Sequence, residues 1–172
     1  MIKEIKFSSA PLAQKVDLFA FDFDGVLTDN RVLIMENGLE AVLCNRSDGL
    51  AFEMIRDAGL AAVIISTERN GVVSKRAEKL NLPVLQAIAD KKRALEDYCK
   101  ALHIDLKRTA FVGNDVNDLS VMQIVGYPIA VADAHPLVKN VATIVLETRG
   151  GDGVAREIAE MLLGISYGAV NR

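Results

Sequence analysis

The chain has 172 residues, of which 51% are hydrophobic and 25% are charged, and its formal net charge at pH 7 is -3. This composition is that of a globular protein, and the length suits one domain over residues 1–172. The negative charge, and the lack of a basic run with interleaved aromatic residues, argue against a nucleic-acid partner. No stretch approaches the roughly 18 consecutive apolar residues of a membrane span, and residues 1–7 do not resemble a signal peptide, so we expect a cytoplasmic protein without a membrane partner.

The first predicted strand carries a pair of carboxylates. After an N-terminal segment with a short helix expected before Val16, the apolar run over residues 18–23 predicts a strand buried on both faces of a parallel sheet. Asp22 and Asp24 point the same way because side chains alternate along a strand, and Gly25 permits a tight turn. Like charges at this end are costly unless a cation or a reaction requires them, and ligands bind at the carboxyl ends of strands in open α/β sheets. The pair predicts a metal-assisted nucleophile site, the alternative being two turn formers.

Residues 29–46 predict a β-hairpin. Two apolar stretches, residues 32–35 and 40–44, flank an Asn37-Gly38 turn. A hairpin placed directly after the first strand does not easily join a parallel sheet, so it should project outward. Both of its faces are apolar, and an isolated hairpin is marginally stable. We therefore expect it to pack against another subunit, the alternative being that it folds back on its own domain.

The remaining chain alternates helices and strands. Helices are predicted over residues 49–58 (with Ser47 or Asp48 as N-cap), 72–80, 90–102, from Asp118 to Val125, and 154–163. Strands are predicted over residues 60–66, 83–86, 109–113, 127–131 and 142–146. This order predicts an α/β fold, a single Rossmann-like, doubly wound parallel sheet with right-handed crossovers.

Polar side chains follow three further predicted strands, on the same sheet edge as the first pair. They are Ser66 and Thr67 after the second strand, Lys91 after the third, and Asp115 and Asp118 after the fourth. Each alone has an ordinary explanation as a cap or a solvated charge. Together they supply a nucleophile, a proton donor, a hydroxyl, a cation and a metal-binding acid, as phosphoryl transfer through an aspartyl-phosphate requires.

The sequence resembles a haloacid dehalogenase superfamily phosphatase in four motifs, which are Asp22-Phe23-Asp24-Gly25-Val26, Ser66, Lys91 and Gly113-Asn114-Asp115-Val116-Asn117-Asp118. The resemblance implies that Asp22 attacks phosphorus. Asp24 would protonate the leaving alkoxide and then activate water. Ser66 and Lys91 would bind the phosphoryl oxygens, with Asp118 orienting Lys91.

The same resemblance implies a magnesium cofactor. Mg²⁺ would be held by the Asp22 carboxylate, the Asp24 backbone carbonyl and an acid after the fourth strand. Related enzymes often carry that acid directly after the glycine, where this chain has Asn114. The ligand is therefore either the amide oxygen of Asn114 or the neighbouring Asp115, and the sequence leaves both open.

The spacing leaves no room for a cap domain, since only the hairpin and one helix fit between Asp24 and Ser66. In this respect the chain resembles the capless 3-deoxy-manno-octulosonate 8-phosphate phosphatase subfamily. Further resemblance lies in residues 26–29, 46–49, 130–136 and 149–151, which makes Thr28, Asp48 and Arg149 candidate substrate-binding residues. The subfamily implies a homotetramer in which the hairpin of one subunit covers its neighbour's site.

One stretch departs from the octulosonate enzymes, which usually have Gly-Arg after the second-motif hydroxyl. This chain has Thr67-Glu68-Arg69, with Arg76 and Lys79 in the next helix, and so resembles the subgroup acting on deaminoneuraminate and acylneuraminate 9-phosphates. Glu68 would accept hydrogen bonds from sugar hydroxyls, while Arg76 or Lys79 would face the substrate carboxylate, and Thr67 is a further candidate substrate-binding residue. The alternative for Arg76 and Lys79 is that they are solvated helix charges.

The sequence thus predicts a magnesium-dependent phosphatase of a 2-keto-3-deoxy nine-carbon sugar acid. One alternative is 3-deoxy-manno-octulosonate 8-phosphate phosphatase activity. Another is a non-catalytic tetramerisation module, similar to the domain fused to some acylneuraminate cytidylyltransferases.

Overall fold

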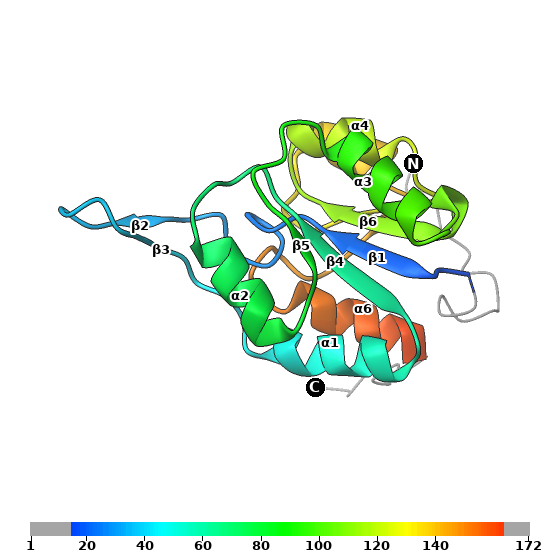
Figure 1. The fold of residues 1–172 in the computed structure, drawn as a ribbon, viewed down its shortest axis with the longest axis horizontal. Coiled ribbons are helices and arrows are strands. Elements are labelled where there is room, and N and C mark those ends of the chain that lie inside the picture. Colours follow the sequence, from blue (N-terminus) through cyan, green and yellow to red (C-terminus); the bar gives the residue numbers. More distant parts are fainter. Residues whose placement is uncertain (1–14, 164–172) are drawn as a thin grey trace, which may run out of the picture.

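The structure is a computed structural model that describes residues 15–163, so the short helix expected before Val16 lies outside the described residues. Its core is a six-stranded sheet in which the strand order is β5-β4-β1-β6-β7-β8 and every neighbouring pair is parallel. The strands are β1 (Leu18–Phe21), β4 (Ala61–Ile65), β5 (Val84–Leu85), β6 (Thr109–Gly113), β7 (Tyr127–Ala130) and β8 (Ile144–Val145). The predicted α/β fold is confirmed (Figure 1).

Helices cover both faces of the sheet. They are α1 (Ser47–Asp57), α2 (Val72–Leu80), α3 (Lys91–Ala101), α4 (Leu119–Met122), α5 (Pro136–Val141) and α6 (Val154–Leu163), with 3-10 turns η2 (Leu106–Arg108) and η3 (Val116–Asp118). In Figure 1, α1 and α6 lie on one side of the sheet, and α3 and α4 lie on the other. The central strands β1 and β6 are therefore buried at every residue, which explains why their sequences are runs of mostly apolar residues rather than alternating patterns.

Three local predictions were wrong. Helix α1 begins at Ser47 with Arg46 in the N-cap position, so neither Ser47 nor Asp48 caps it. Helix α4 ends at Met122 rather than at residue 125. Helix α5 was not predicted at all, although His135 caps it by accepting from the Leu137 N–H, and a proline stands at its first position.

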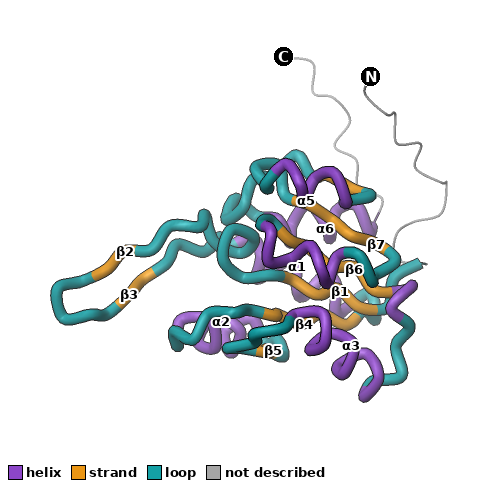
Figure 2. Tube along the Cα trace, turned by 90° about the horizontal axis from the view of Figure 1, so that it is seen from above, coloured by secondary structure: helices purple, strands orange, loops and turns teal. Residues whose placement is uncertain are grey.

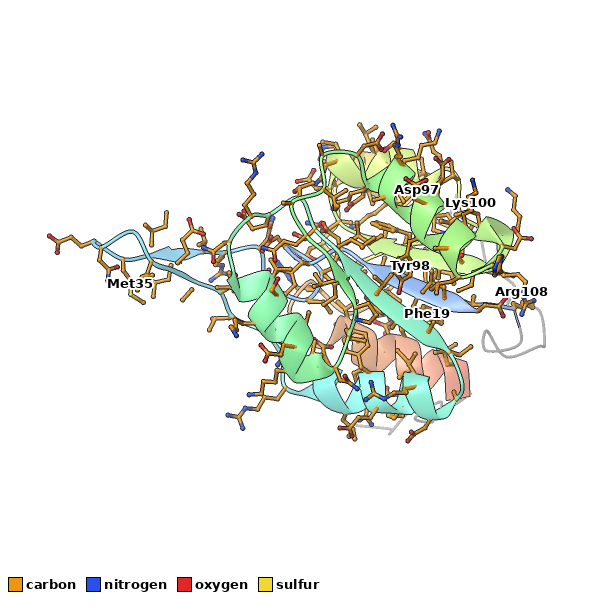
Figure 3. All side chains as sticks on the ribbon, viewed as in Figure 1. Phe19, Met35, Asp97, Tyr98, Lys100 and Arg108 are labelled. Carbon is orange, nitrogen blue, oxygen red and sulfur yellow. The ribbon has the colours of Figure 1, made fainter. Side chains whose placement is uncertain are left out.

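An ion pair connects β1 and β6 at the ends where these two strands begin. Arg108 donates to both carboxylate oxygens of Asp17, over 2.6 and 2.7 Å, and the Asp17 N–H donates to the Arg108 carbonyl. Figure 3 shows Arg108 at the opposite end of the molecule from Met35. This pair holds the two central strands in register where they begin.

Residues 29–46, which we call the arm, project away from the sheet (Figure 1, Figure 2). The arm contains the antiparallel strands β2 (Leu33–Ile34) and β3 (Glu40–Ala41), shorter than predicted, and a bridge between Thr28 and Cys44 closes its base. Its exposed hydrophobic side chains are Val32, Leu33, Ile34, Met35, Leu39 and Leu43. The projection is as predicted, and the alternative that the hairpin folds back on its own domain is wrong.

The connections between the strands carry the arm and the helices, and no cap domain is inserted within residues 15–163. Over the same residues, no helix has both the length and the apolar composition needed to cross a membrane.

Candidate functional site

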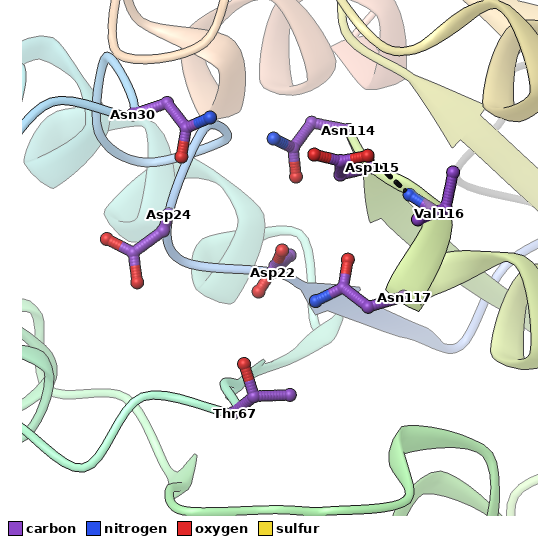
Figure 4. Close-up of a pocket in the computed structure, with 8 residues that line it drawn as sticks. All are labelled: Asp22, Asp24, Asn30, Thr67, Asn114, Asp115, Val116 and Asn117. Carbon is purple, nitrogen blue, oxygen red and sulfur yellow. Dashed lines mark hydrogen bonds between the residues drawn. The ribbon is translucent and has the colours of Figure 1, made fainter.

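The predicted polar residues converge at the carboxyl ends of the central strands. A cavity of about 200 Å³ opens there, lined by Asp22, Asp24, Asn30, Thr67, Asn114, Asp115, Val116 and Asn117. Figure 4 shows that these side chains come from the loops after β1, β4 and β6. The parallel arrangement causes this, because it brings the ends of three strands to one edge of the sheet.

Lys91 joins two carboxylates, one of which, Asp22, lines this cavity. Its ammonium lies 2.7 Å from Oδ1 of Asp22 and 2.7 Å from Oδ1 of Asp118, and all three side chains are buried. Burial by itself lowers the pKa of Lys91, but the charges of Asp22 and Asp118 outweigh it and hold the pKa above its usual value. Lys91 therefore stays charged, and it is no solvated lysine.

One ammonium cannot neutralise two carboxylates. Asp118 has further support, since its Oδ2 accepts the N–H groups of Asn114 and Asp115 over 2.9 and 3.3 Å. Among the backbone N–H groups of residues 15–163, only that of Phe23 donates to the Asp22 carboxylate, over 2.7 Å. Burial, with the charge of Asp118 added to it, raises the pKa of Asp22 to about 7, and Lys91 only partly opposes this. With all three groups ionised the cluster of Lys91, Asp22 and Asp118 has one negative charge in excess, and the raised pKa shows that the charged form of Asp22 is the one disfavoured.

The loop after β6 is shaped around Asp118. A Cβ on Gly113 would lie 2.7 Å from Oδ2 of Asp118, so glycine is required for that carboxylate to reach the backbone of the loop. Asp115 begins the turn η3, and its Oδ1 accepts the Val116 N–H over 2.7 Å. Asp118 is thus both the partner of Lys91 and part of a capping box with Asp115.

Asp24 stands half-buried at the mouth of the cavity. Burial raises the pKa of its carboxyl, and the charge of Glu68 adds to this, while Lys91 and a hydrogen bond from Thr28 oppose it. Gly25 turns the chain with a φ of 79°, and a Cβ there would lie 2.0 Å from Nδ2 of Asn114. The close packing of the two loops therefore depends on glycine at position 25.

Ser66 and Glu68 lie in the turn after β4. The buried Ser66 hydroxyl accepts the Glu68 N–H over 3.0 Å and keeps its own proton to donate. Glu68 is exposed, and its Oε1 accepts the N–H groups of Arg69 and Asn70 over 2.6 and 2.9 Å. Thr67 between them lines the cavity.

Arg76 and Lys79 line a different cavity, of about 260 Å³, together with Arg46, Gly49 and Leu80. The two cavities share no lining residue. One Nη of Arg76 donates to the Asn45 carbonyl over 2.6 Å, whereas its buried Nε has no hydrogen-bond partner in the described part of the chain. Within one subunit, these two cations are not brought to the cavity that contains Asp22.

Three other predicted substrate-binding residues do not line the cavity that contains Asp22, and each interacts with another residue of the chain instead. Thr28 is buried, and its hydroxyl accepts the N–H groups of Gly25 and Asn30. Asp48 is buried and accepts the Ala155 N–H at the start of α6, over 3.1 Å. Arg149 is exposed and pairs with Asp133 over 3.4 Å. A substrate role for these residues stays a prediction.

Sequence reasoning missed Asn30 and Asn117 as lining residues. Asn30 follows an aspartate at the start of the arm and has a positive φ of 64°, for which the Asp29-Asn30 pair was a signal. Asn117 lay within the recognised motif but was given no role.

A magnesium ion fits the oxygen atoms that face this cavity. No group of three His, Cys, Asp or Glu side chains within residues 15–163 is arranged to bind a metal. Oδ1 of Asn114, however, is buried without a hydrogen-bond partner, and Figure 4 shows it directed toward Asp22. Because Mg²⁺ prefers oxygen ligands and retains waters, Asp22, the Asp24 carbonyl and Asn114 form a suitable set.

Comparison with known proteins agrees with this geometry. The sequence model of the haloacid dehalogenase-like hydrolases matches residues 59–158. The chain is 34% identical over 152 residues to the 3-deoxy-D-manno-octulosonate 8-phosphate phosphatase of Escherichia coli K12, covering 88% of this chain and 81% of that protein.

Solved structures extend the similarity. A HAD family hydrolase from Streptomyces avermitilis superposes with a TM-score of 0.87 at 47% identity, covering 91% of this chain and 96% of that one. The 3-deoxy-D-manno-octulosonate 8-phosphate phosphatase of Moraxella catarrhalis, solved with magnesium, phosphate and KDO, superposes with a TM-score of 0.85 at 29% identity, covering 90% of each chain.

Proposed function

The chain belongs to the haloacid dehalogenase-like hydrolases, and we propose that it hydrolyses the phosphate ester of a 2-keto-3-deoxy sugar acid. The family and its phosphatase relatives make it a phosphoric monoester hydrolase that uses a divalent metal, Mg²⁺. The observation that carries the proposal is the buried Lys91 between Asp22 and Asp118, next to a cavity that Asp22, Asp24 and Asn114 line. Buried charges arranged in this way are costly to the fold and are typical of catalytic sites.

In this proposal Asp22 is the nucleophile and Asp24 the proton carrier. An oxygen of Asp22 bonds to phosphorus while the bond from phosphorus to the sugar oxygen breaks, and Asp24 gives its proton to that oxygen. Water then adds to phosphorus, Asp24 takes a proton from it, the bond to Asp22 breaks, and phosphate leaves. The raised pKa of Asp24 suits the first step, because it favours the protonated form that the leaving alkoxide needs.

Ser66 and Lys91 complete the site. The Ser66 hydroxyl would donate to a phosphoryl oxygen, and Lys91 would offset negative charge on the transferring group, with Asp118 holding it in place. Mg²⁺, held by Asp22, the Asp24 carbonyl and Asn114, would supply the positive charge that the excess carboxylate and the phosphate require.

The relatives favour an eight-carbon substrate over the nine-carbon one that the sequence analysis put first. Both phosphatases compared above are named for 3-deoxy-D-manno-octulosonate 8-phosphate, and we take it as the leading candidate. The nine-carbon deaminoneuraminate or acylneuraminate 9-phosphate is the second candidate. It is favoured by Glu68, whose exposed carboxylate stands close enough to Asp24 to raise the pKa of that group.

We also propose that the arm joins subunits into a homotetramer. Its exposed apolar residues have no cover within the described chain, and the cavity of Arg76 and Lys79 is separate from that of Asp22. In this arrangement the arm covers a neighbour's cavity, and the two cations meet the substrate carboxylate across the subunit boundary. The cytoplasmic location stays a prediction.

The test of function is phosphate release with magnesium from the octulosonate 8-phosphate and both neuraminate 9-phosphates. We expect turnover of at least one substrate that the Asp22→Asn variant loses, while circular dichroism shows the variant folded. The substrate with the highest kcat/KM names the sugar acid. Folded wild-type protein that releases phosphate from none of the three would favour the non-catalytic module.

A further inference from the structure

Asn114 presents an oxygen atom that the fold leaves unused. Its side-chain Oδ1 is buried and has no hydrogen-bond partner within residues 15–163. The backbone around it is fixed, because the Asn114 N–H donates to Asp118 and the Asn114 carbonyl accepts the His135 N–H over 2.8 Å. Its amide nitrogen lies over Gly25, where no Cβ is present to displace it. The oxygen is therefore held in position before any ligand arrives.

Asp115 is not an equivalent donor. It is exposed, and its Oδ1 accepts the Val116 N–H at the start of η3. Its own N–H donates to Asp118, which completes the capping box. Asp115 thus serves the local turn, and its charge is screened by water.

The buried charges at this site belong to Asp22, Asp118 and Lys91, and with all three groups ionised they sum to one negative charge. The carboxylates of Asp24 and Asp115 also line the cavity, but Asp24 is only half-buried and Asp115 is exposed, so water screens their charges. Asn114 adds an oxygen ligand but no charge. A divalent cation bound next to Asn114 is therefore only partly neutralised by the protein. The remaining positive charge can be neutralised by a bound phosphoryl group.

We propose that Asn114 is the side-chain metal ligand after β6, and that its neutral amide couples metal binding to phosphate binding. The metal then binds weakly to the free enzyme and tightly once a phosphoryl group is present. A carboxylate at this position would hold the metal more tightly by itself and would weaken the coupling, because it repels the phosphate. This inference rests on the metal-dependent family chemistry and not on which sugar acid is the substrate.

The test measures binding of Mn²⁺, a paramagnetic substitute for Mg²⁺, by electron paramagnetic resonance, with and without inorganic phosphate. For the wild type we expect phosphate to lower the Mn²⁺ Kd by about tenfold. Asn114→Asp should lower the Kd without phosphate by about tenfold and show a smaller effect of phosphate. Asn114→Ala, which removes the oxygen, should raise the Kd in both conditions.

Asp115→Asn is the matched control, since asparagine preserves the turn's cap while removing a charge one residue away. Its Kd should stay within about twofold of the wild type, as expected for an exposed, screened charge. A weaker Mn²⁺ affinity in Asp115→Asn with no change in Asn114→Ala would overturn the ligand assignment. Equal wild-type affinity with and without phosphate would overturn the coupling. Neither result depends on sugar phosphate turnover, so failure here is separate from failure of the proposed substrate.

Discussion

The Lys91 ammonium donates to the Asp118 carboxylate over 2.7 Å, although the two residues are 27 positions apart and belong to different elements. Asp118 links the cation to the loop after β6, because its second oxygen accepts the backbone N–H groups of Asn114 and Asp115. One side chain therefore sets the position of both the cation and the proposed metal ligand.

Asp118→Asn tests this link. The amide keeps the size but can satisfy either the loop N–H groups or Lys91, so Lys91 should move toward Asp22. We expect kcat to fall by about 10²–10³-fold, in the range for loss of a preorganised charge. Steady-state kinetics with the preferred sugar phosphate measures it. A kcat within threefold of wild type would mean that Asp118 does not position Lys91.

Gly150 packs closely against the backbone of Gly25, the residue after Asp24. A Cβ at this position would lie 2.1 Å from the Gly25 carbonyl oxygen, and the Gly150 N–H donates to Asp133 over 2.9 Å. Gly150→Ala must push the loop after Asp24 aside, so we expect a loss of about 1–3 kcal/mol in the free energy of unfolding, as for an overpacked site, together with lower kcat. Urea denaturation measures the first quantity. Gly71→Ala is the control, because nothing lies within 4 Å of its added Cβ, and it should change neither.

Asp48 makes the stability depend on pH. Burial raises the pKa of its carboxyl to about 6 in the folded protein, against about 3.9 when unfolded. Between these values the folded state binds more protons, so this group makes stability fall as the pH rises from about 4 to about 6, by about 1–3 kcal/mol in total. Asp48→Asn keeps the acceptor for the Ala155 N–H and should remove that slope, as urea denaturation across the range would record. The control Asp152→Asn, which changes an exposed acid in the loop before α6, should keep the wild-type slope.

The arm provides a test of assembly. Leu33 and Ile34 expose 64% and 66% of their surface, so replacing both by Asp should cost the isolated subunit little stability. If the arm joins subunits, the double variant buries two charges at the interface, and sedimentation velocity should show a shift from tetramer to smaller species. Leu102→Asp, an exposed leucine after α3, is the control and should remain tetrameric. A wild type that sediments as a monomer would itself refute the proposed assembly.

The convergence of Asp22, Ser66 and Lys91 was predictable because parallel strands end at one edge of the sheet. Residues that follow the carboxyl ends of neighbouring strands in the sequence therefore lie near one another. The role of Asp48 was not predictable, because its partner Ala155 is 107 residues away. The sequence shows that an Asp can cap a helix, but it does not show which helix that Asp caps. Helix α5 escaped prediction because six residues are too few for a helical period to emerge.

The separate cavity of Arg76 and Lys79 was equally hidden from the sequence. Both residues follow Ser66 closely in the chain, yet α2 turns them toward Arg46 and Gly49 near the base of the arm. The direction of α2 relative to the sheet determines which cavity Arg76 and Lys79 line, and the local sequence does not predict that direction.

Glu68 separates the two substrate candidates. Its carboxylate caps its own turn through the N–H groups of Arg69 and Asn70, so any substitution can act through the turn or through the sugar. Glu68→Gln keeps an acceptor oxygen for the turn and removes only the charge, whereas Glu68→Arg removes both. If Glu68 accepts hydrogen bonds from sugar hydroxyls, Glu68→Arg leaves a hydroxyl without its partner. The ratio of kcat/KM for the nine-carbon substrate to that for the eight-carbon substrate should then fall by about tenfold or more. Glu68→Gln should lower this ratio less. Competition assays with both sugar phosphates measure that ratio. Equal losses on both substrates in Glu68→Arg would mean that Glu68 shapes the turn beside Ser66 and does not select the sugar.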